Sequence, residues 1–173
     1  SGSGTYARTV QGKEREIISV KDFKNTDGTQ VALDGTQDDT VGIQAAVVFC
    51  ETFASGAILH FPASTGYGKI TTQLGINASI SIKGSGRYTS GIVCIGGING
   101  FVINTGVDHV TIENLDIAQA VRFSTTANGA AGITIIGTSG SHSNSHTFRD
   151  VLIDGFRDAI IGDYFYFCLF DNV

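Results

Sequence analysis

A short repeated pattern near the end of the chain constrains its fold more than any other feature. Three segments, 112–115, 148–151 and 170–173, each contain an apolar residue, a charged residue, Asn or Asp, and a second apolar residue. The second and third copies are 22 positions apart, which suits one coil of a β-solenoid, and the first and second are 36 positions apart, which requires an insertion. The pattern therefore predicts a chain that winds into stacked coils.

Stacking of the three copies assigns a role to each position of the pattern. The third residue is predicted to form a tight turn in the left-handed backbone region, which Asn and Asp tolerate. The second residues would stand outside, one above another, at a strand spacing of roughly 4.8 Å. Such an exposed charge ladder is worth well under about 1 kcal/mol per pair, so we interpret it as a solvated edge. The inward residues are Ile112, Phe148 and Phe170, the turn residues are Asn114, Asp150 and Asn172, and the outer residues are Glu113, Arg149 and Asp171.

A polar segment accounts for the extra length of the longer interval. Residues 137–145 consist of Gly, Ser, Thr, His and Asn, and this composition predicts a loop. His142 and His146 are a pair without a third ligand in this serine-rich region. We therefore interpret them as loop residues and predict no metal site.

Short runs of apolar and polar residues follow one another from residue 80 onward. They are separated by Gly and Asn, and no helical period competes after Phe53, which favours an all-β fold over a doubly wound sheet. The clearest predicted strands are 80–82, 91–95, 101–103, 110–112, 132–136 and 165–168.

One amphipathic helix is predicted ahead of these strands. Apolar residues recur at spacings of three and four from 43 to 54, which indicates a helix over about 39–53. A strand-like segment, 20–23, precedes it, and a short buried strand, 57–61, follows it. A helix in this place would cover the apolar end of the first coil.

Two adjacent carboxylates, Asp38 and Asp39, stand at the start of the predicted helix. Side chains there can accept hydrogen bonds from the first free backbone N–H groups, and their charge suits the positive end of the helix. We therefore interpret both residues as helix caps and not as a catalytic pair.

The composition excludes several classes of function. Only 16% of the residues are charged, the formal net charge is -5 and the basic residues are scattered, so nucleic acid is not an expected partner. No apolar run is long enough to span a membrane, and no targeting signal opens the chain. Three widely separated cysteines, Cys50, Cys94 and Cys168, predict neither a disulfide framework nor a zinc site. We expect them to be small buried side chains, and we predict no metal and no cofactor.

Several stretches between residues 15 and 88 resemble a known superfamily. They are similar to the opening of the pectate-lyase-like superfamily and, more narrowly, to the N-terminal part of the β-helix domain of bacteriophage tailspikes and capsular polysaccharide depolymerases. Loops 24–33 and 64–67 depart from the family pattern. The stretches are Val20-Lys21-Asp22-Phe23, Asp34-Gly35-Thr36-Gln37-Asp38-Asp39-Thr40, Ile43-Gln44-Ala45-Ala46 and Leu59-His60-Phe61-Pro62-Ala63, with 15–19 before them and 82–88 after them.

The resemblance implies an architecture, an assembly and a location. The fold would be an all-β, right-handed parallel β-helix with one N-terminal capping helix, and the assembly would be a homotrimer. Such a protein is made in the host cytoplasm, belongs to the virion tail and acts at the bacterial cell surface. It binds, and often cleaves, a capsular or other surface polysaccharide.

The predicted domain organisation has three parts. Residues 1–4 resemble a cloning scar, 5–19 form a neck segment, and 20–173 form the N-terminal portion of a β-helix domain that is truncated. Apolar residues of the last coil, such as Phe170 and Val173, would leave an open core edge. We therefore expect further coils after Val173, or a partner chain that continues the β-helix.

The predicted function is that of a tailspike fragment that recognises and, in the complete protein, degrades bacterial capsule or exopolysaccharide. Hydrolase and lyase chemistry both stay open, and we expect this chain alone to lack the full active site. The alternatives are a non-catalytic polysaccharide-binding structural trimer and a secreted pectinase-type glycosidase or lyase. Glycoside hydrolysis commonly uses paired carboxyl groups. The candidate catalytic groups are Glu113 with Asp116, and Asp154 with Asp158 and Asp163, and the candidate saccharide-binding residues are Tyr88, Tyr164 and Arg157.

Overall fold

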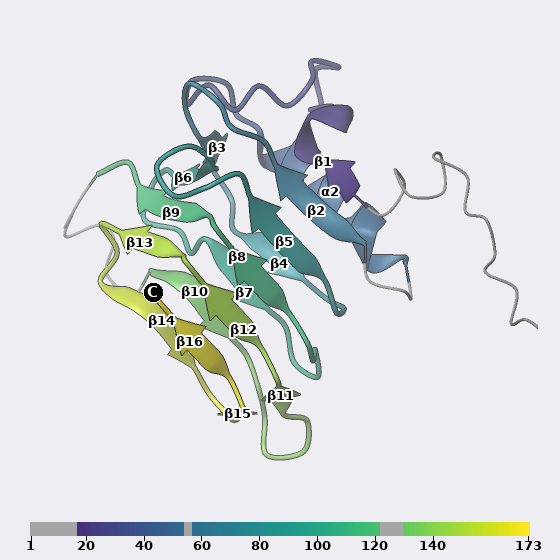
Figure 1. Cartoon of the computed structure of the whole chain (residues 1–173), viewed down its shortest axis with the longest axis vertical. Coiled ribbons are helices and arrows are strands. Elements are labelled where there is room, and N and C mark those ends of the chain that lie inside the picture. Colours follow the sequence, from purple (N-terminus) through teal and green to yellow (C-terminus); the bar gives the residue numbers. More distant parts are fainter. Residues whose placement is uncertain (1–16, 54–56, 122–129) are drawn as a thin grey trace, which may run out of the picture.

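A computed structural model of the chain describes residues 17–53, 57–121 and 130–173. This part is mostly β, with parallel sheets, one α-helix and one short 3-10 helix (Figure 1). The predicted cloning scar, 1–4, and most of the predicted neck, 5–19, lie outside the described residues.

Three parallel sheets make up most of the described structure. The six-strand sheet contains, in spatial order, β1 (Ile17–Ser19), β2 (Ile58–Phe61), β5 (Ser81–Gly84), β8 (Thr111–Glu113), β12 (Thr147–Arg149) and β16 (Leu169–Asp171). The β3–β13 sheet contains β3 (Gly68–Ile70), β6 (Gly91–Cys94), β9 (Asp116–Gln119) and β13 (Leu152–Asp154). The β4–β14 sheet contains β4 (Leu74–Ile76), β7 (Phe101–Ile103), β10 (Ala131–Ile135) and β14 (Asp158–Gly162).

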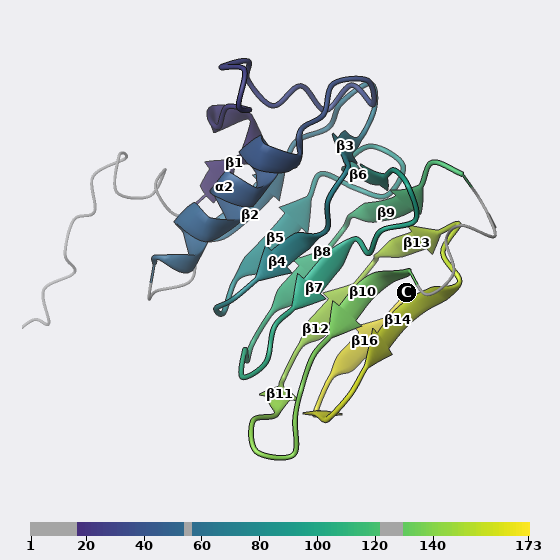
Figure 2. The ribbon, with the colours of Figure 1, turned by 180° about the vertical axis from the view of Figure 1, so that it is seen from behind.

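The chain visits these sheets in a fixed order. From β2 onward each pass goes from the six-strand sheet to the β3–β13 sheet, then to the β4–β14 sheet, and then back. Every pair of named strands is parallel, and each pass lies beside the one before it (Figures 1 and 2). This arrangement is consistent with the predicted parallel β-helix.

The core lies between the sheets and is built from rows of apolar side chains in register. Along the six-strand sheet, each inward residue stands opposite its counterpart in the next strand. Burial of each such side chain stabilises the fold by about 1.5–3 kcal/mol. The fully buried members of this row are Leu59, Ile82, Ile112 and Phe148.

The predicted repeat is confirmed by the strand register. Phe148 pairs with Ile112 on one side and with Phe170 on the other, and the two phenyl rings stack with centroids 5.4 Å apart. Turn residues Asn114 and Asp150 have φ of 54° and 51°, as the left-handed turn requires. The outer ladder also forms, with Glu113–Arg149 and Arg149–Asp171 ion pairs of 3.4 and 3.2 Å, and φ of Asn172 is 54°.

The predicted helix is present as α2 (Thr40–Glu51), slightly shorter than the predicted 39–53. It lies across one end of the stacked strands, beside β1 and β2 (Figure 2). The Gln44 side-chain amide donates to the Gly75 carbonyl and accepts from the Gly75 N–H, at 2.9 and 2.8 Å. These bonds tie the helix to the outer edge of β4.

The predicted strand 20–23 is wrong, because Val20–Asp22 forms the 3-10 helix η1. Ser19 and Asp22 form a reciprocal capping box that favours a helical turn: the Ser19 hydroxyl accepts from the Lys21 N–H at 3.2 Å, and Asp22 accepts from the Ser19 N–H. The strand lies just before this turn, in β1.

The predicted capping roles hold for only one of the two carboxylates. Asp38 accepts a hydrogen bond from the first helical N–H, that of Thr40, at 3.0 Å. Asp39 makes no side-chain cap, so the prediction is wrong there. It is fully buried and accepts from the Leu33 N–H at 2.9 Å and the Asn25 amide at 3.1 Å. Asn25 in turn accepts from the Gly42 N–H at 3.0 Å, so a distant loop residue caps the helix.

The predicted loop 137–145 is wrong over its last residues. Ser143–Asn144 forms β11, which pairs with β15 (Phe165–Tyr166). His146, predicted as a loop residue, is fully buried, and its Nδ1 accepts from the Val110 N–H at 3.2 Å. No group of three or more potential ligands in the described residues could hold a metal ion.

The predicted burial of the cysteines holds at two of the three positions. All three cysteines are free; Cys50 and Cys94 are buried as predicted, and Cys168 is only half-buried. Burial raises the pKa of Cys50 to about 11 and that of Cys94 to about 12. Among the helices described, none is long and apolar enough to cross a membrane.

Candidate functional site

A hollow of about 220 Å³ lies on the outer face of the β3–β13 sheet, and we call it the Asp116 hollow. It contains three of the side chains predicted from the sequence as site residues: Tyr88, Asp116 and Asp154. The lining residues are Tyr67, Tyr88, Asp116, Ile117, Ala118, Gln119, Leu152 and Asp154.

Strand alternation explains why these side chains face outward. Ile117 of β9 is fully buried in the core, so its neighbour Asp116 points to the other face of the sheet. Asp116 stands opposite Gly91 in β6. A Cβ at Gly91 would lie 2.3 Å from the Asp116 carbonyl oxygen, so only glycine leaves room for this strand contact.

Asp116 is the best-defined polar group of the hollow. Its side chain is nearly fully buried, with 1% of the residue exposed. Oδ2 accepts hydrogen bonds from the Tyr67 hydroxyl and, at 2.8 Å, from the Tyr88 N–H. Oδ1 is also buried and has no hydrogen-bond partner within residues 17–53, 57–121 and 130–173. A buried polar atom without a partner costs about 1–3 kcal/mol, so this oxygen is a place where a ligand donor would stabilise the protein.

The two tyrosines frame Asp116 from different coils. Burial and the hydrogen bond to Asp116 raise the pKa of Tyr67, so its hydroxyl keeps its proton and remains a donor. Tyr88 has a φ of 67°, a strained conformation for a residue with a side chain, and it is 72% exposed. The bond from its N–H to Asp116 holds this strained turn. The Arg87 guanidinium lies 5.8 Å from the centre of the Tyr88 ring.

The structure divides the predicted carboxylate pairs between different sheets. Glu113 belongs to the six-strand sheet and pairs with Arg149, whereas Asp116 belongs to the β3–β13 sheet. Asp154 and Asp158 are likewise on different sheets. Asp116 and Asp154 lie on neighbouring strands and face the same side of the sheet. Asp154 is in register with Ala118, which is two residues after Asp116.

The remaining predicted site residues lie away from the hollow lining. Arg157 forms an exposed ion pair of 2.7 Å with Asp158, and Asp163 is an exposed residue after β14. Tyr164 is 51% exposed, has a φ of 49°, and lies 6.3 Å from the His142 ring. Tyr67 is not among the predicted site residues, because its contact with Asp116, 49 positions further along the chain, depends on how the coils stack.

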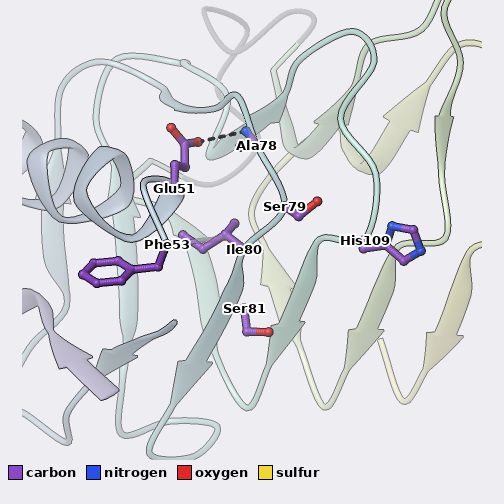
Figure 3. A pocket seen from close by; sticks show the side chains of 7 residues that line it. All are labelled: Glu51, Phe53, Ala78, Ser79, Ile80, Ser81 and His109. Carbon is purple, nitrogen blue, oxygen red and sulfur yellow. Dashed lines mark hydrogen bonds between the residues drawn. The ribbon is translucent and has the colours of Figure 1, made fainter. Parts of the chain in front are cut away.

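A second and larger hollow lies at the turn from β4 into β5, beside the end of α2 (Figure 3). Its volume is about 390 Å³, and its acidic residue is Glu51. Figure 3 shows this carboxylate directed at the backbone of Ala78; it accepts from the N–H groups of Asn77 and Ala78 at 2.5 and 3.3 Å. Glu51 thus supports the turn. The other lining residues are Phe53, Ser79, Ile80, Ser81 and His109.

The comparisons with known proteins support the class of fold that these sheets define. No protein-family model matches the chain, and no curated protein matches it. A solved structure described as Geobacillus virus E2 ORF18 is similar, with a TM-score of 0.60 and 24% sequence identity. The match covers 82% of this chain and 27% of that one, so the chain spans about a quarter of the length of its structural relative. The two proteins share their fold over this region.

Proposed function

We propose that this chain is part of a bacteriophage tail protein that recognises a bacterial surface polysaccharide through the Asp116 hollow. The observation that carries the proposal is the buried Asp116 Oδ1, which has no hydrogen-bond donor among the residues that the structure describes and lies in a hollow framed by two tyrosines. Saccharides supply many hydrogen-bond donors, and their C–H faces suit aromatic rings such as Tyr88. Concave sites with a few convergent polar groups are typical of ligand binding.

Two observations support the assignment to a phage tail. One is the shared fold with a protein of Geobacillus virus E2. The other is the resemblance of residues 20–63 to tailspikes and capsular polysaccharide depolymerases. We accordingly propose a right-handed parallel β-helix that assembles as a homotrimer in the virion tail and presents its β3–β13 sheet to the cell surface.

Cleavage of the bound polysaccharide is a second candidate function, and one observation favours it. Asp116 and Asp154 both face outward from neighbouring strands, offset by two residues. Strand spacing and rise place their Cα atoms roughly 8 Å apart. Two carboxylates on one face of a sheet are the kind of pair that glycoside hydrolysis commonly uses. A non-catalytic structural trimer or a secreted pectinase-type enzyme are the alternatives.

Binding to encapsulated and capsule-free cells of the same strain tests the proposed recognition. The labelled chain should bind only the encapsulated cells. Tyr88→Ala should weaken binding at least about tenfold, because it removes the exposed ring of the hollow. Tyr164→Ala is the matched control, since Tyr164 is also exposed and has a positive φ but lies elsewhere; it should stay within about twofold of the unmodified chain.

Two assays test whether the bound polysaccharide is cleaved. Reducing-sugar release from purified capsule identifies a hydrolase, and new ultraviolet absorbance identifies the unsaturated product of a lyase. Capsule binding without either signal from the full-length parent would favour the non-catalytic alternative. Absence of binding to any surface polysaccharide by both the chain and its parent would overturn the proposed function.

A further inference from the structure

We infer that the Asp116 hollow selects saccharides that carry a positively charged amino group. The inference rests on the proposed function, because it names the class of saccharide for the same site. A free amino sugar offers a hydrogen-bond donor and a positive charge on one atom. The side chains that line the hollow supply neither a hydrogen-bond donor nor a positive charge to Asp116 Oδ1.

The contacts of Asp116 show why a neutral donor would satisfy it less well. Its Oδ2 already accepts from two neutral donors, the Tyr67 hydroxyl and the Tyr88 N–H. Within the part of the chain that the structure describes, no Lys, Arg or His forms an ion pair with this carboxylate. Burial of a carboxylate is costly unless it is paired, and charge-assisted hydrogen bonds are about twice as strong as neutral ones.

Two basic side chains of this region, Lys69 and Arg87, have contacts with groups other than Asp116. Lys69 lies on the same outer face, two strands away from Ala118, and its Nζ donates to the Thr36 carbonyl at 3.0 Å. The Arg87 guanidinium lies over the Tyr88 ring at 5.8 Å.

The aromatic residues add to the same preference. The faces of tyrosine rings are electron-rich and attract ammonium groups, and two tyrosines line the hollow. A uronic acid would instead bring a second negative charge against Asp116. The hollow is therefore suited to an ammonium group and not to an acidic sugar.

Ligand entry requires a side chain to move, because Asp116 Oδ1 is enclosed in the free chain. Tyr88 is the one exposed residue among those that line the hollow, and 72% of it is accessible. We therefore expect the Tyr88 ring to swing outward on binding. The resonances of the Tyr88 amide and ring should shift on addition of ligand.

A matched pair of ligands tests the inference by isothermal titration calorimetry. The probes are a glucosamine tetramer with free amines, at a pH where they are protonated, and the same tetramer N-acetylated. The free-amine tetramer should bind at least about tenfold tighter, and added salt should reduce this ratio. Asp116→Asn should reduce the preference to about twofold, because the amide oxygen still accepts from Tyr67 and Tyr88 while the charge is lost.

The control variant is Asp171→Asn, which makes the same charge change on an exposed carboxylate of the six-strand sheet. It should retain the full preference, and thermal unfolding of both variants verifies that they are folded. Equal binding of the two tetramers, a preference that survives Asp116→Asn, or binding only to polysaccharides without amino groups would each overturn the inference and leave the proposed function standing. Failure of the chain and its parent to bind any saccharide would overturn both.

Discussion

The Asp116 hollow and the hollow beside α2 differ in size and in the hydrogen bonding of their acidic groups. The hollow beside α2 is the larger, at about 390 Å³ against about 220 Å³, but its Glu51 carboxylate accepts two backbone hydrogen bonds and supports a turn. In the Asp116 hollow, both bonds go to Oδ2 and the buried Oδ1 has none. Unmet hydrogen-bonding capacity therefore distinguishes a candidate binding site better than volume does.

A strained residue lines each hollow, and the strain is held in different ways. His109, beside the larger hollow, has a φ of 57°, and its N–H donates to the Asn144 carbonyl of the next coil at 3.0 Å. Tyr88 has a φ of 67° and is held by the Asp116 side chain. The first conformation follows from coil stacking, whereas the second depends on the site itself, which fits a functional role for Tyr88.

Replacement of each acid by alanine should affect a different property of the protein. These are the largest effects that we expect. Asp116→Ala removes the acceptor of Tyr67 and Tyr88, so saccharide affinity should fall about 10–100-fold, equivalent to about 1.4–2.8 kcal/mol. Glu51→Ala should leave affinity unchanged and lower the free energy of unfolding by about 1–2 kcal/mol, because two backbone N–H groups lose their acceptor. Calorimetry and urea unfolding measure the two quantities. Loss of affinity in Glu51→Ala alone would move the candidate site to the larger hollow.

The second-largest effect that we expect is a loss of folding stability at low pH, caused by a histidine near the larger hollow. The Val110 N–H, which follows His109, donates to Nδ1 of buried His146, so the ring proton is on Nε2 and faces the Ser143 hydroxyl at 3.0 Å. Burial is the main cause that lowers the pKa of His146, and His109 adds to it while Asp108 opposes it. As the pH falls, the unfolded chain therefore binds a proton at a higher pH than the folded chain does. Stability is complete above the unfolded histidine pKa of about 6.5 and falls with decreasing pH, by at most about 1.4 kcal/mol per pH unit.

Urea unfolding at a series of pH values around and below about 6.5 measures how the free energy of unfolding changes with pH. Two histidine variants identify the residue that causes the change. His146→Gln should lower stability at every pH but flatten its dependence below about pH 6.5. His142→Ala, at an exposed position of the same segment, should keep the original slope. A slope that persists in His146→Gln would assign the acid sensitivity to another group.

The parts of the fold that were predictable are those that repeat or follow a periodic pattern. The register of Ile112, Phe148 and Phe170 could be derived from a four-residue pattern, since stacked coils place equivalent residues opposite each other. The helix could be derived from its apolar stripe. Strands β3 and β4 were not predicted, because each has three residues of which one is glycine, and this leaves too few apolar residues to mark a strand.

The candidate site was predictable in its residue types but not in its pairing. Tyr88, Asp116 and Asp154 were all named from the sequence, yet Asp116 was paired with Glu113, which an intervening turn places on another sheet. Tyr67 comes within hydrogen-bonding distance of Asp116 only because β3, β6 and β9 stack in register. Contacts that depend on long-range register have no local sequence signal.

Mutation of the outer charge ladder should give the smallest effect of those predicted here. Arg149 lies within 3.4 Å of Glu113 and 3.2 Å of Asp171, but its side chain is 46% exposed. Solvent screening limits such a pair to well under about 1 kcal/mol. A double-mutant cycle with Arg149→Ala and Glu113→Ala should therefore give a coupling of about 0.5 kcal/mol or less and leave saccharide affinity unchanged. A coupling above about 1 kcal/mol, or a change in affinity, would mean that this face contributes more than a solvated edge, and the contrast between exposed paired acids and the buried Asp116 would lose its basis.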